Sequence, residues 1–477
     1  MVSSVLNQEQ ISRIHGASLE ILERVGVHLP HPEVLSRFAD SGARVDWSSA
    51  RVWIPESLVA RCLGSAGKSF TLYGRDVAHT AAFGQGQRNY NSVAGEALWV
   101  ETPGSERRYP TLEDVATASR LGDALDAINV VGAMADPQGV SVSCRCVEVL
   151  ATQVRNTTKP VHFWYHDRAS ARYINEILIA VRGGAAEATA QPLCYPFLEP
   201  ISPLRFPFNG VDLLFETARL NLPVPIGPMA QMGLSAPATL AGTMAQENAE
   251  ILAGLCITQL IRPGMPVCYG GICHAFDMRT TQLIFSGPEQ AIFGVAMTQM
   301  GKHYGLPVYI NVGLTDSKRP DAQAGLESGV TLALGAAAGA DIFGHMGISG
   351  VDQAASLDML VLHNEVIRYV ESTLRPIEVS DEMLGLDEVE AAGPGGSFLD
   401  RDHTVRHFRK ELWFPRLLDR DYYDAWRSSG AVDTAQRCAE WKARLLSTHR
   451  PEPVAPDLDR ALTDIVTSAQ RELTKAE

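Results

Sequence analysis

The chain has 477 residues, a formal net charge of −14, 45% hydrophobic and 20% charged residues, a composition typical of a globular protein. The acidic balance argues against a nucleic-acid partner, because phosphate binding needs concentrated Lys and Arg. It contains no run of about 18 apolar residues and no basic segment followed by an apolar core. We therefore expect no membrane span and no signal peptide, and we place the protein in the cytoplasm.

Residues 1–110 predict an N-terminal α+β appendage. Apolar residues at helical spacing over 7–24 and 55–63 indicate helices, and residues 42–52 alternate as in a short hairpin. Further short strands follow up to residue 110. Tyr90 lies in one of these strand-turn segments, and we expect the segment to cover the mouth of the next domain.

From residue 111 the chain alternates between apolar runs and helical segments. The predicted strands are 128–135, 160–165, 193–199, 223–229, 266–272, 307–314, 340–346 and 375–380. Eight strands with intervening helices over roughly 250 residues predict a (β/α)8 TIM barrel, an α/β fold, which we assign to residues 111–385. The alternative is an open doubly wound sheet. That fold needs a Gly-rich phosphate loop after its first strand, and residues 132–140 lack GxGxxG.

The clearest β-α-β unit of this domain spans residues 307–350. An apolar strand is followed by the polar loop 314–321 and then by a helix with an Ala/Gly-rich face, which suits close packing on a parallel sheet. Parallel strands place the loops at their carboxyl ends on one side of the sheet, where α/β folds keep their chemistry. The candidate site is therefore sought at the strand ends.

Residues 386–477 predict a helical C-terminal extension. The segment begins with a Gly/Pro-rich hinge and continues with basic and aromatic helical sequence. We expect it to fold over the barrel or onto a second subunit, and its aromatic residues favour a homodimer or a larger homo-oligomer.

Polar and aromatic side chains gather where the predicted strands end. The candidate substrate-binding residues are Tyr90, His166, Glu199, Tyr269, His274, Asn311, Asp316 and His345. Each also has a structural reading: the two histidines at 274 and 345 can be core residues, and Asp316 can cap a helix or pair with Lys318. Glu199 precedes a proline and is therefore held extended, as either a ligand for a cation or a member of an ion pair.

The sequence lacks the motifs of several other common types of functional site. Cys144 and Cys146 form CxC within a helix and are assigned to packing, while His403 and His407 lack the Glu of HExxH, so we expect no metal site. No GxSxG, phosphate-binding loop, dinucleotide fingerprint or EF-hand occurs. The residues by themselves predict a barrel with a polar, aromatic mouth and leave the catalytic residues unassigned.

Several long blocks resemble the trimethylamine methyltransferase family. They include HGASLEILERVGVHLPHPEVL at 15–35, ERRYPTLEDVATASRLGDAL at 106–125, LTDSKRPDAQAGLESG at 314–329 and HTVRHFRKELWFPRLLDRDYYDAW at 403–426. The similarity runs from about residue 10 to about residue 445. It implies a (β/α)8 barrel and the transfer of a methyl group from a methylated amine to the cobalt of a separate corrinoid protein.

One departure from that family concerns the substrate. Members that use trimethylamine carry pyrrolysine, whereas this sequence contains only the standard twenty residues. The chain therefore resembles the non-pyrrolysine branch, which includes glycine betaine methyltransferase and acts on quaternary amines. A quaternary nitrogen already carries a positive charge, so its methyl group needs no protonation before attack by Co(I). The corrinoid is expected on a partner protein, because the chain lacks the DxHxxG motif of a cobalamin-binding domain.

The resemblance suggests roles for the candidate residues. Tyr90, Tyr269 and Glu199 are expected near the cation, with His166, His274, Asn311 and His345 as hydrogen-bond donors to a carboxylate tail. Two alternatives remain open at this point. One is a betaine:tetrahydrofolate methyltransferase that works without a corrinoid, and the other is a non-catalytic betaine-binding barrel.

Overall fold

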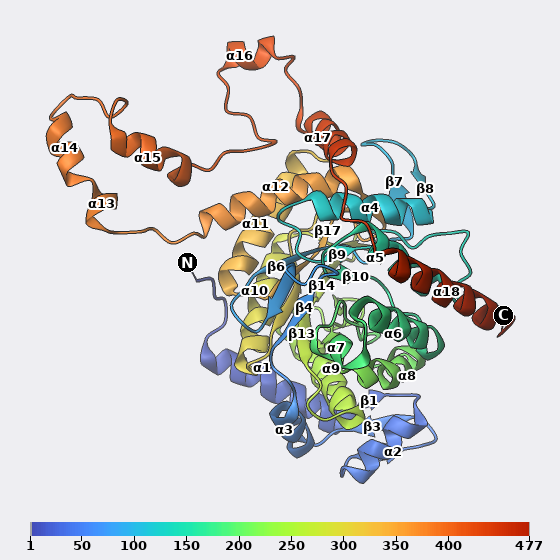
Figure 1. Ribbon diagram of the computed structural model, residues 1–477. Helices are drawn as coiled ribbons and strands as arrows, with labels where there is room; N and C mark the ends of the chain where they lie inside the picture. The colour runs from blue at the N-terminus through green and yellow to red at the C-terminus, as the bar shows by residue number, and fades with distance from the viewer. Residues whose placement is uncertain (1, 477) are drawn as a thin grey trace.

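Parallel strands form a closed ring at the centre of the chain, whose computed structural model describes residues 2–476 (Figure 1). Neighbouring strands of this ring are joined by parallel pairing, by single bridges or, between β10 and residue 193, by one backbone hydrogen bond. In order, the ring consists of β6 (Asn89–Ser92), β9 (Val131–Gly132), β10 (Val161–His162), the segment 193–198, β11 (Val224–Ile226), β13 (Val267–Gly271), β16 (Val308–Asn311) and β17 (Ile342–Met346).

A helix follows each of these eight segments, which confirms the predicted (β/α)8 barrel. The helices are α4 (Leu112–Ala124), α5 (Arg145–Asn156), α6 (Arg168–Arg182), α8 (Phe208–Thr217), α9 (Leu240–Ile261), α10 (Pro288–His303), α11 (Ala322–Ala338) and α12 (Leu357–Thr373). Local sequence sets their ends. The side chain of Asp321 accepts the backbone N–H of Ala324 at 3.0 Å and starts α11, and Gly339 ends it with a φ of 89°.

One strand prediction is wrong, and one strand of the ring comes from outside the predicted barrel range. The segment 375–380 forms no strand, and its Ile377 side chain is 89% exposed, because nothing in the described chain pairs with it. The eighth strand of the ring is instead β6, which lies within residues 1–110, the region predicted to be an N-terminal appendage. β6 pairs with β17 on one side and bridges Val130 with Asn91 on the other. Its residues are polar, so apolar runs do not reveal it.

The rest of the N-terminal region covers the barrel at its side and its bottom. Helices α1 (Gln8–Glu20) and α3 (Glu56–Ser65) pack on α9. Nearby lie the π-helical turn η1 (Ile21–Val25), α2 (Pro32–Asp40) and the small sheet of β1 (Val27–His28), β2 (Arg44–Asp46) and β3 (Arg51–Trp53). The hairpin of β4 (Phe70–Tyr73) and β5 (Thr80–Phe83) closes the amino-terminal end of the ring. Its apolar residues form one cluster with inward side chains that include Tyr195, Cys268 and Tyr309.

Two small sheets surround the opposite, carboxyl end of the ring. One consists of β7 (Leu98–Val100), β8 (Arg107–Arg108), β18 (Ile348–Ser349) and β19 (Ala354–Ser356). The other consists of β12 (Gln231–Met232), β14 (His274–Asp277) and β15 (Gln282–Ile284). Their connections follow β6, β11, β13 and β17, so they bring loop residues to the mouth of the barrel.

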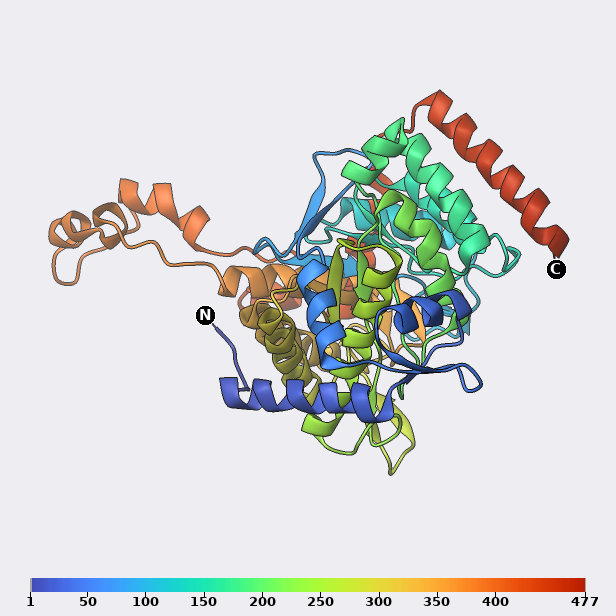
Figure 2. The ribbon, with the colours of Figure 1, turned by 90° about the horizontal axis from the view of Figure 1, so that it is seen from below.

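The predicted C-terminal extension has two different parts. Helices α17 (Thr434–Thr448) and α18 (Pro456–Leu473) return to the barrel, where α17 packs on α12 and α4, and α18 packs on α6 and α5. The segment 375–433, here called the arm, extends away from the barrel in both views (Figures 1 and 2) except near residue 417, where Leu417 is buried and its N–H donates to Glu365 of α12 at 3.0 Å. The arm carries α13 (Asp381–Leu384), α14 (Leu386–Ala392), α15 (Asp402–Glu411) and α16 (Tyr423–Ser428), and none of these helices has a buried residue.

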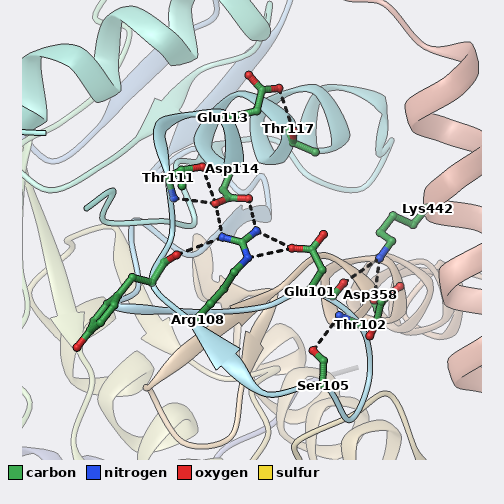
Figure 3. A network of polar contacts seen from close by, with 11 residues as sticks. Glu101, Thr102, Ser105, Arg108, Thr111, Glu113, Asp114, Thr117, Asp358 and Lys442 are labelled. Carbon is green, nitrogen blue, oxygen red and sulfur yellow. Dashed lines mark hydrogen bonds and ion pairs between the residues drawn. The ribbon is translucent and has the colours of Figure 1, made fainter. Parts of the chain in front are cut away.

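Charged contacts fasten the returning part to the mouth sheet (Figure 3). Arg108 of β8 contacts Glu101 at 2.5 Å and the Asp114 carboxylate of α4 at 2.7 Å. Lys442 of α17 donates to the buried carboxylate of Asp358 in α12 at 2.9 Å and to the carbonyl of Glu101, next to β7, at 3.5 Å. These pairs link α4, α12 and α17, so the arm leaves and re-enters an ordered surface. No helix among residues 2–476 is long and apolar enough to cross a membrane.

Candidate functional site

Aromatic rings line the inside of the barrel near its carboxyl end. The ring centroids of Trp164 and Phe197 lie 6.1 Å apart at 89°, and those of Phe197 and Tyr309 lie 5.4 Å apart. His162 lies 5.7 Å from Trp164, and His345 lies 6.0 Å from Tyr309. Trp164 is held by a hydrogen bond from its Nε1 to the carbonyl of Gly95 at 3.0 Å. The faces of such rings attract cations.

A cavity of about 510 Å³ opens from these rings to the surface. Trp164 and Phe197 form its inner wall, Glu199 and Gln231 supply polar groups, and Ile201 and Leu234 lie at its exposed rim. Its full lining is Trp164, Tyr165, His166, Phe197, Glu199, Pro200, Ile201, Ser202, Pro207, Asn209, Gly210, Leu213, Met229, Gln231, Leu234 and Ser235. None of these residues is Lys or Arg. The size suits a small ligand.

Three carboxylates lie within electrostatic reach of one another at this mouth. Glu96 is in the loop between β6 and β7, Glu199 follows the fourth ring segment, and Asp352 is in the turn between β18 and β19. Burial, and then the charge of Asp352, raise the pKa of Glu96 to about 9 and that of Glu199 to about 7. Burial raises the pKa of Asp352 to about 6. No Lys or Arg offsets these shifts.

Outside the mouth, several buried or half-buried carboxylates are paired with bases, whereas Glu247 and Glu250 of α9 are held by backbone N–H groups and, for Glu250, also by Ser202 and Gln246. Glu371, for example, accepts a bidentate contact from Arg88, and its pKa is lowered despite its burial. The three mouth carboxyl groups likewise have no cationic partner among the described residues, and the charge of Asp352 acts on the other two. Unpaired buried charge of this kind is expensive and marks candidate ligand sites.

Strained backbone holds Asp352 in place. Val351 and Asp352 have φ values of 60° and 41°, a region that β-branched residues rarely adopt. Such conformations cluster where ligands bind, because the surrounding structure must support them. Here the strained turn lies between two strands of the mouth sheet.

Neutral imidazoles and an amide surround the inner end of the cavity. Asn91 Nδ2 donates to His162 Nδ1 at 3.0 Å, so Nδ1 of His162 is the acceptor and Nε2 carries the proton. Burial, and then His345, lower the pKa of His162, and burial lowers that of His345 to about 4. His162 Nε2, His345 Nδ1 and the Oδ1 atoms of Asn91 and Asn311 have no hydrogen-bond partner. These atoms are available to a ligand.

Gly344, before His345 in β17, makes this arrangement sterically possible. A Cβ atom at this position would overlap the hydroxyl of Tyr309 and the side chain of Asn91. The two groups approach the backbone only because no side chain intervenes. The residue type at 344 is thus tied to the position of the Asn91–His162 pair.

The structure places the eight predicted site residues in different surroundings. Glu199 and His166 line the cavity, and the His166 Nδ1 lies 3.1 Å from the carbonyl of Val142. Asn311 and His345 are buried at the ends of β16 and β17. Their roles toward a substrate stay predictions.

His274 and Asp316 lie beside the mouth, in contact with the β15 segment. His274 stacks on Phe285 at 4.6 Å, and burial lowers its pKa to about 3, with the backbone of Ile284 offsetting part of the shift. Asp316 accepts the backbone N–H of Phe285 at 2.9 Å, which is a structural contact.

Tyr90 and Tyr269 point away from the cavity. The ring of Tyr90 stacks on Phe343 at 5.1 Å, and its hydroxyl donates to Glu371 of α12. The hydroxyl of Tyr269 donates to Asn248 of α9 at 2.8 Å. Successive side chains of a strand face opposite sides, so the inward positions of β6 belong to the neighbours of Tyr90.

Sequence analysis missed Asn91, Glu96, His162, Tyr309 and Asp352. The alternation of β6 and β10 is the signal that could have found Asn91 and His162, once the inward parity was known. No local pattern points to Glu96 and Asp352, because both come from turns of the mouth sheet. We expected no metal site, and the arm contains one group of residues that could hold a metal ion. The ligating atoms of Glu382, His403 and His407 lie within 4.8 Å of one another. There the Glu382 carboxylate already accepts from Arg406 and pairs with His407.

The substitution Glu96→Gln tests the buried mouth charge. Because burial raises the pKa of Glu96 to about 9, the folded state holds a proton that the unfolded state releases near pH 4.5. The stabilising contribution of this group is complete at a pH below its pKa in the unfolded state, and it is lost as the pH rises toward about 9. We expect the melting temperature of Glu96→Gln minus that of the wild type to grow from about pH 6 to about pH 9. A constant difference across this range would contradict the placement of Glu96.

Comparisons with known proteins agree with this geometry. The family model described as trimethylamine methyltransferase (MTTB) matches residues 2–474. The trimethylamine methyltransferase MttB of Desulfitobacterium hafniense strain DSM 10664 / DCB-2 is 30% identical over 467 residues, 98% of this chain and 94% of that protein. The glycine betaine methyltransferase of Desulfitobacterium hafniense strain Y51 is 29% identical over 473 residues, 98% of each chain.

A solved structure supports the fold independently. The crystal structure of the Methanosarcina barkeri monomethylamine methyltransferase (MtmB) superposes with a TM-score of 0.52 at 11% sequence identity, covering 99% of this chain and 88% of that chain. At this identity the likeness concerns the fold alone.

Proposed function

Because the chain belongs to the trimethylamine methyltransferase family and is a methyltransferase, we propose that it moves a methyl group from a quaternary amine to the Co(I) of a separate corrinoid protein. In this reaction one C–N bond breaks and its electron pair stays on nitrogen, which leaves as a neutral tertiary amine. The methyl group bonds to the cobalt of the acceptor, which passes from Co(I) to Co(III). Glycine betaine, the substrate named for one relative, is the starting expectation.

The observation that supports this proposal is the set of unneutralised carboxylates beside aromatic faces. A quaternary ammonium group cannot donate a hydrogen bond, so a protein binds it through ring faces and negative charge. Trp164 and Phe197 supply the faces, and Glu199 and Asp352 supply the charge. Methyl transfer turns the cation into a neutral amine, which loses this attraction and is released.

The rim of the mouth suits the docking of a large partner. Val142, Ile201, Leu234 and Met278 are exposed apolar residues on loops at the carboxyl end of the barrel. Exposed apolar side chains gathered around a cavity mark interaction surfaces. When bound, the corrinoid of the partner supplies the cobalt nucleophile, while this chain orients the substrate and excludes water from it. The cofactor is thus proposed to arrive with the partner and to leave with it.

Purified protein mixed with free cob(I)alamin and a panel of quaternary amines tests the function. We expect the absorbance of methylcobalamin to rise with time in the presence of a quaternary amine. Transfer to tetrahydrofolate in a mixture free of any corrinoid would replace the proposal with the first alternative. Binding of quaternary amines without any methyl transfer, even with corrinoid proteins from methylamine-using organisms, would support the non-catalytic barrel.

Trp164→Leu is expected to weaken binding of a quaternary amine about tenfold, because a desolvated cation over a Trp face gains about 1–2 kcal/mol. The substitution also removes the bond to Gly95. Titration calorimetry gives the dissociation constant. The control is Trp47→Leu, since Trp47 is an exposed residue of the N-terminal region and is expected to leave the affinity unchanged. Equal affinities for both variants would exclude the aromatic wall from cation binding.

The arm is proposed to pack against a second copy of the chain, which makes the protein a homo-oligomer. It has no buried residue in its four helices, and Leu399 and Tyr422 are 88% and 92% exposed. A segment of this size without a core usually needs a partner to stay ordered. The segment 401–420 carries six Lys or Arg against three Asp or Glu, which complements an acidic chain of net charge −14.

Leu399→Asp combined with Tyr422→Asp is expected to shift the mass measured by light scattering from an oligomer toward a single chain, because it places two charges in the proposed interface. Leu326→Asp is the matched control, as Leu326 is also exposed but lies on α11 of the barrel. An unchanged mass for the double variant would contradict the interface.

The cytoplasm remains the proposed location. The cysteines at 62, 146, 194, 256, 268, 273 and 438 are buried free thiols. Several buried free thiols in one chain suit a reducing compartment.

A further inference from the structure

The charge of the mouth bears on the tail of the substrate as well as on its methylated head. Glu199 lines a cavity that has no Lys or Arg in its lining, and the charge of Asp352 acts on Glu199 from the turn between β18 and β19. Glycine betaine carries a carboxylate two bonds from its nitrogen. A head group bound between Trp164 and Phe197 would bring that carboxylate close to Glu199 and Asp352, and like charges in a desolvated site repel strongly.

The basic residues nearest the mouth are already engaged by other groups. Arg145 contacts Asp136 at 2.6 Å, Lys318 donates to the carbonyl of Asp316 at 2.8 Å, and Arg107 donates to Gln353 at 2.6 Å. The imidazoles of His162, His274 and His345 are neutral, because burial lowers the pKa of each. No Lys or Arg of the cavity lining therefore offers a positive charge to a carboxylate tail.

The unengaged polar groups at the inner end of the cavity include two amide oxygens. The Oδ1 atoms of Asn91 and Asn311 are buried and have no partner, and the carboxylate oxygens add further acceptors. Such groups are satisfied by a hydroxyl or N–H of the ligand, since each unmet buried acceptor is unfavourable.

We propose that the substrate of this enzyme is a quaternary ammonium compound without a carboxylate, whose tail ends in a hydrogen-bond donor such as a hydroxyl group. This inference rests on the proposed function and narrows its substrate class. Aromatic faces hold the methylated head, Glu199 and Asp352 balance its charge, and the tail donates to the amide oxygens. The transferred methyl leaves its electron pair on nitrogen, so the product is a neutral tertiary amine that carries the same tail.

Choline and glycine betaine make a matched pair of probes, because they share the trimethylammonium head and differ at the hydroxyl or carboxylate end. Tetramethylammonium reports the head alone. Calorimetric titration of the full chain with the three compounds, at one ionic strength and at about pH 8, is expected to show choline binding at least about tenfold more tightly than glycine betaine. Tetramethylammonium is expected to lie between them. Glycine betaine binding as tightly as choline, or more tightly, would overturn the proposal.

Variants locate the effect at the mouth. Glu199→Gln and, separately, Asp352→Asn are each expected to weaken choline binding about tenfold and to reduce the preference for choline over glycine betaine. Each removes a poorly solvated negative charge, so the melting temperature without ligand is expected to stay the same or rise. Glu440→Gln on α17, an exposed position, is the control and is expected to change neither value. A preference that survives both mouth variants would also overturn the proposal.

The binding experiment and the methyl-transfer experiment test the two proposals separately, so one proposal can be contradicted while the other is supported. Preferential choline binding without methylation of any corrinoid contradicts the proposed function and supports the charge argument. Methyl transfer from glycine betaine, with tight betaine binding, supports the proposed function and overturns the inference on the tail.

Discussion

Asp341→Ala is expected to lower the free energy of unfolding by roughly 3 kcal/mol, the largest stability loss that we predict. Asp341 is 1% exposed and begins the segment that leads into β17. Its Oδ1 accepts the N–H of Gly84 at 2.6 Å, and its Oδ2 accepts the N–H of Val308 at 2.9 Å and contacts Lys302 Nζ at 2.5 Å. The carboxylate thus joins the hairpin that closes the barrel, the start of β16 and helix α10.

Chemical denaturation, followed by circular dichroism, measures the loss. Removing the carboxylate leaves two backbone N–H groups without a partner, and the half-exposed Lys302 regains only its own solvation. The control is Asp457→Ala, which breaks an ion pair with Arg460 at a position 89% exposed and is expected to lose less than about 0.5 kcal/mol. If the two variants lose the same free energy, the tie between hairpin and barrel is not as described.

Gly344→Ala is expected to reduce the rate of methyl transfer about a hundredfold, because displacement of site groups by about 1 Å has effects of this size. The new Cβ would overlap the Tyr309 hydroxyl and the Asn91 side chain. Both groups would move, and with them the hydrogen bond that holds His162. The measurement is the initial rate of methylcobalamin formation at saturating amine.

A second Gly→Ala change separates this effect from a general loss of stability. Gly325 lies in α11, and an added Cβ there meets no atom within 4 Å. Gly325→Ala is expected to keep the full rate and to stabilise the helix by up to about 1 kcal/mol. Near-normal activity of Gly344→Ala would show that Asn91 and Tyr309 can shift without effect on the reaction.

Apolar periodicity was sufficient for most of the barrel. Seven of the eight predicted strand positions are ring segments, because buried parallel strands need continuous apolar side chains on both faces. β6 escaped this criterion, since Asn89 and Asn91 point into the ring, where they bond to other polar groups. The segment 375–380 satisfied the same criterion but forms no strand, since a strand needs a neighbouring strand to pair with.

The candidate site divides in a similar way. Glu199 and His166, chosen because they follow strand ends, line the cavity, since a parallel barrel collects its carboxyl ends on one side. Tyr90 and Tyr269 were misplaced, since the inward parity of a strand depends on its pairing. Their suggested roles near the cation are not supported by this geometry.

The sequence by itself determined the alternation of strands and helices, the location of candidate site residues at the strand ends and the resemblance to a methyltransferase family. Local periodicity and the order of residues in long blocks carry this information. Only the tertiary structure decided which strand closes the ring, which side chains face inward and how the charges at the mouth combine. Glu96, Glu199 and Asp352 are separated by more than a hundred residues along the chain and acquire their shared field through folding alone. Electrostatic interactions depend on distance in space and on burial, and neither can be read from order in the sequence.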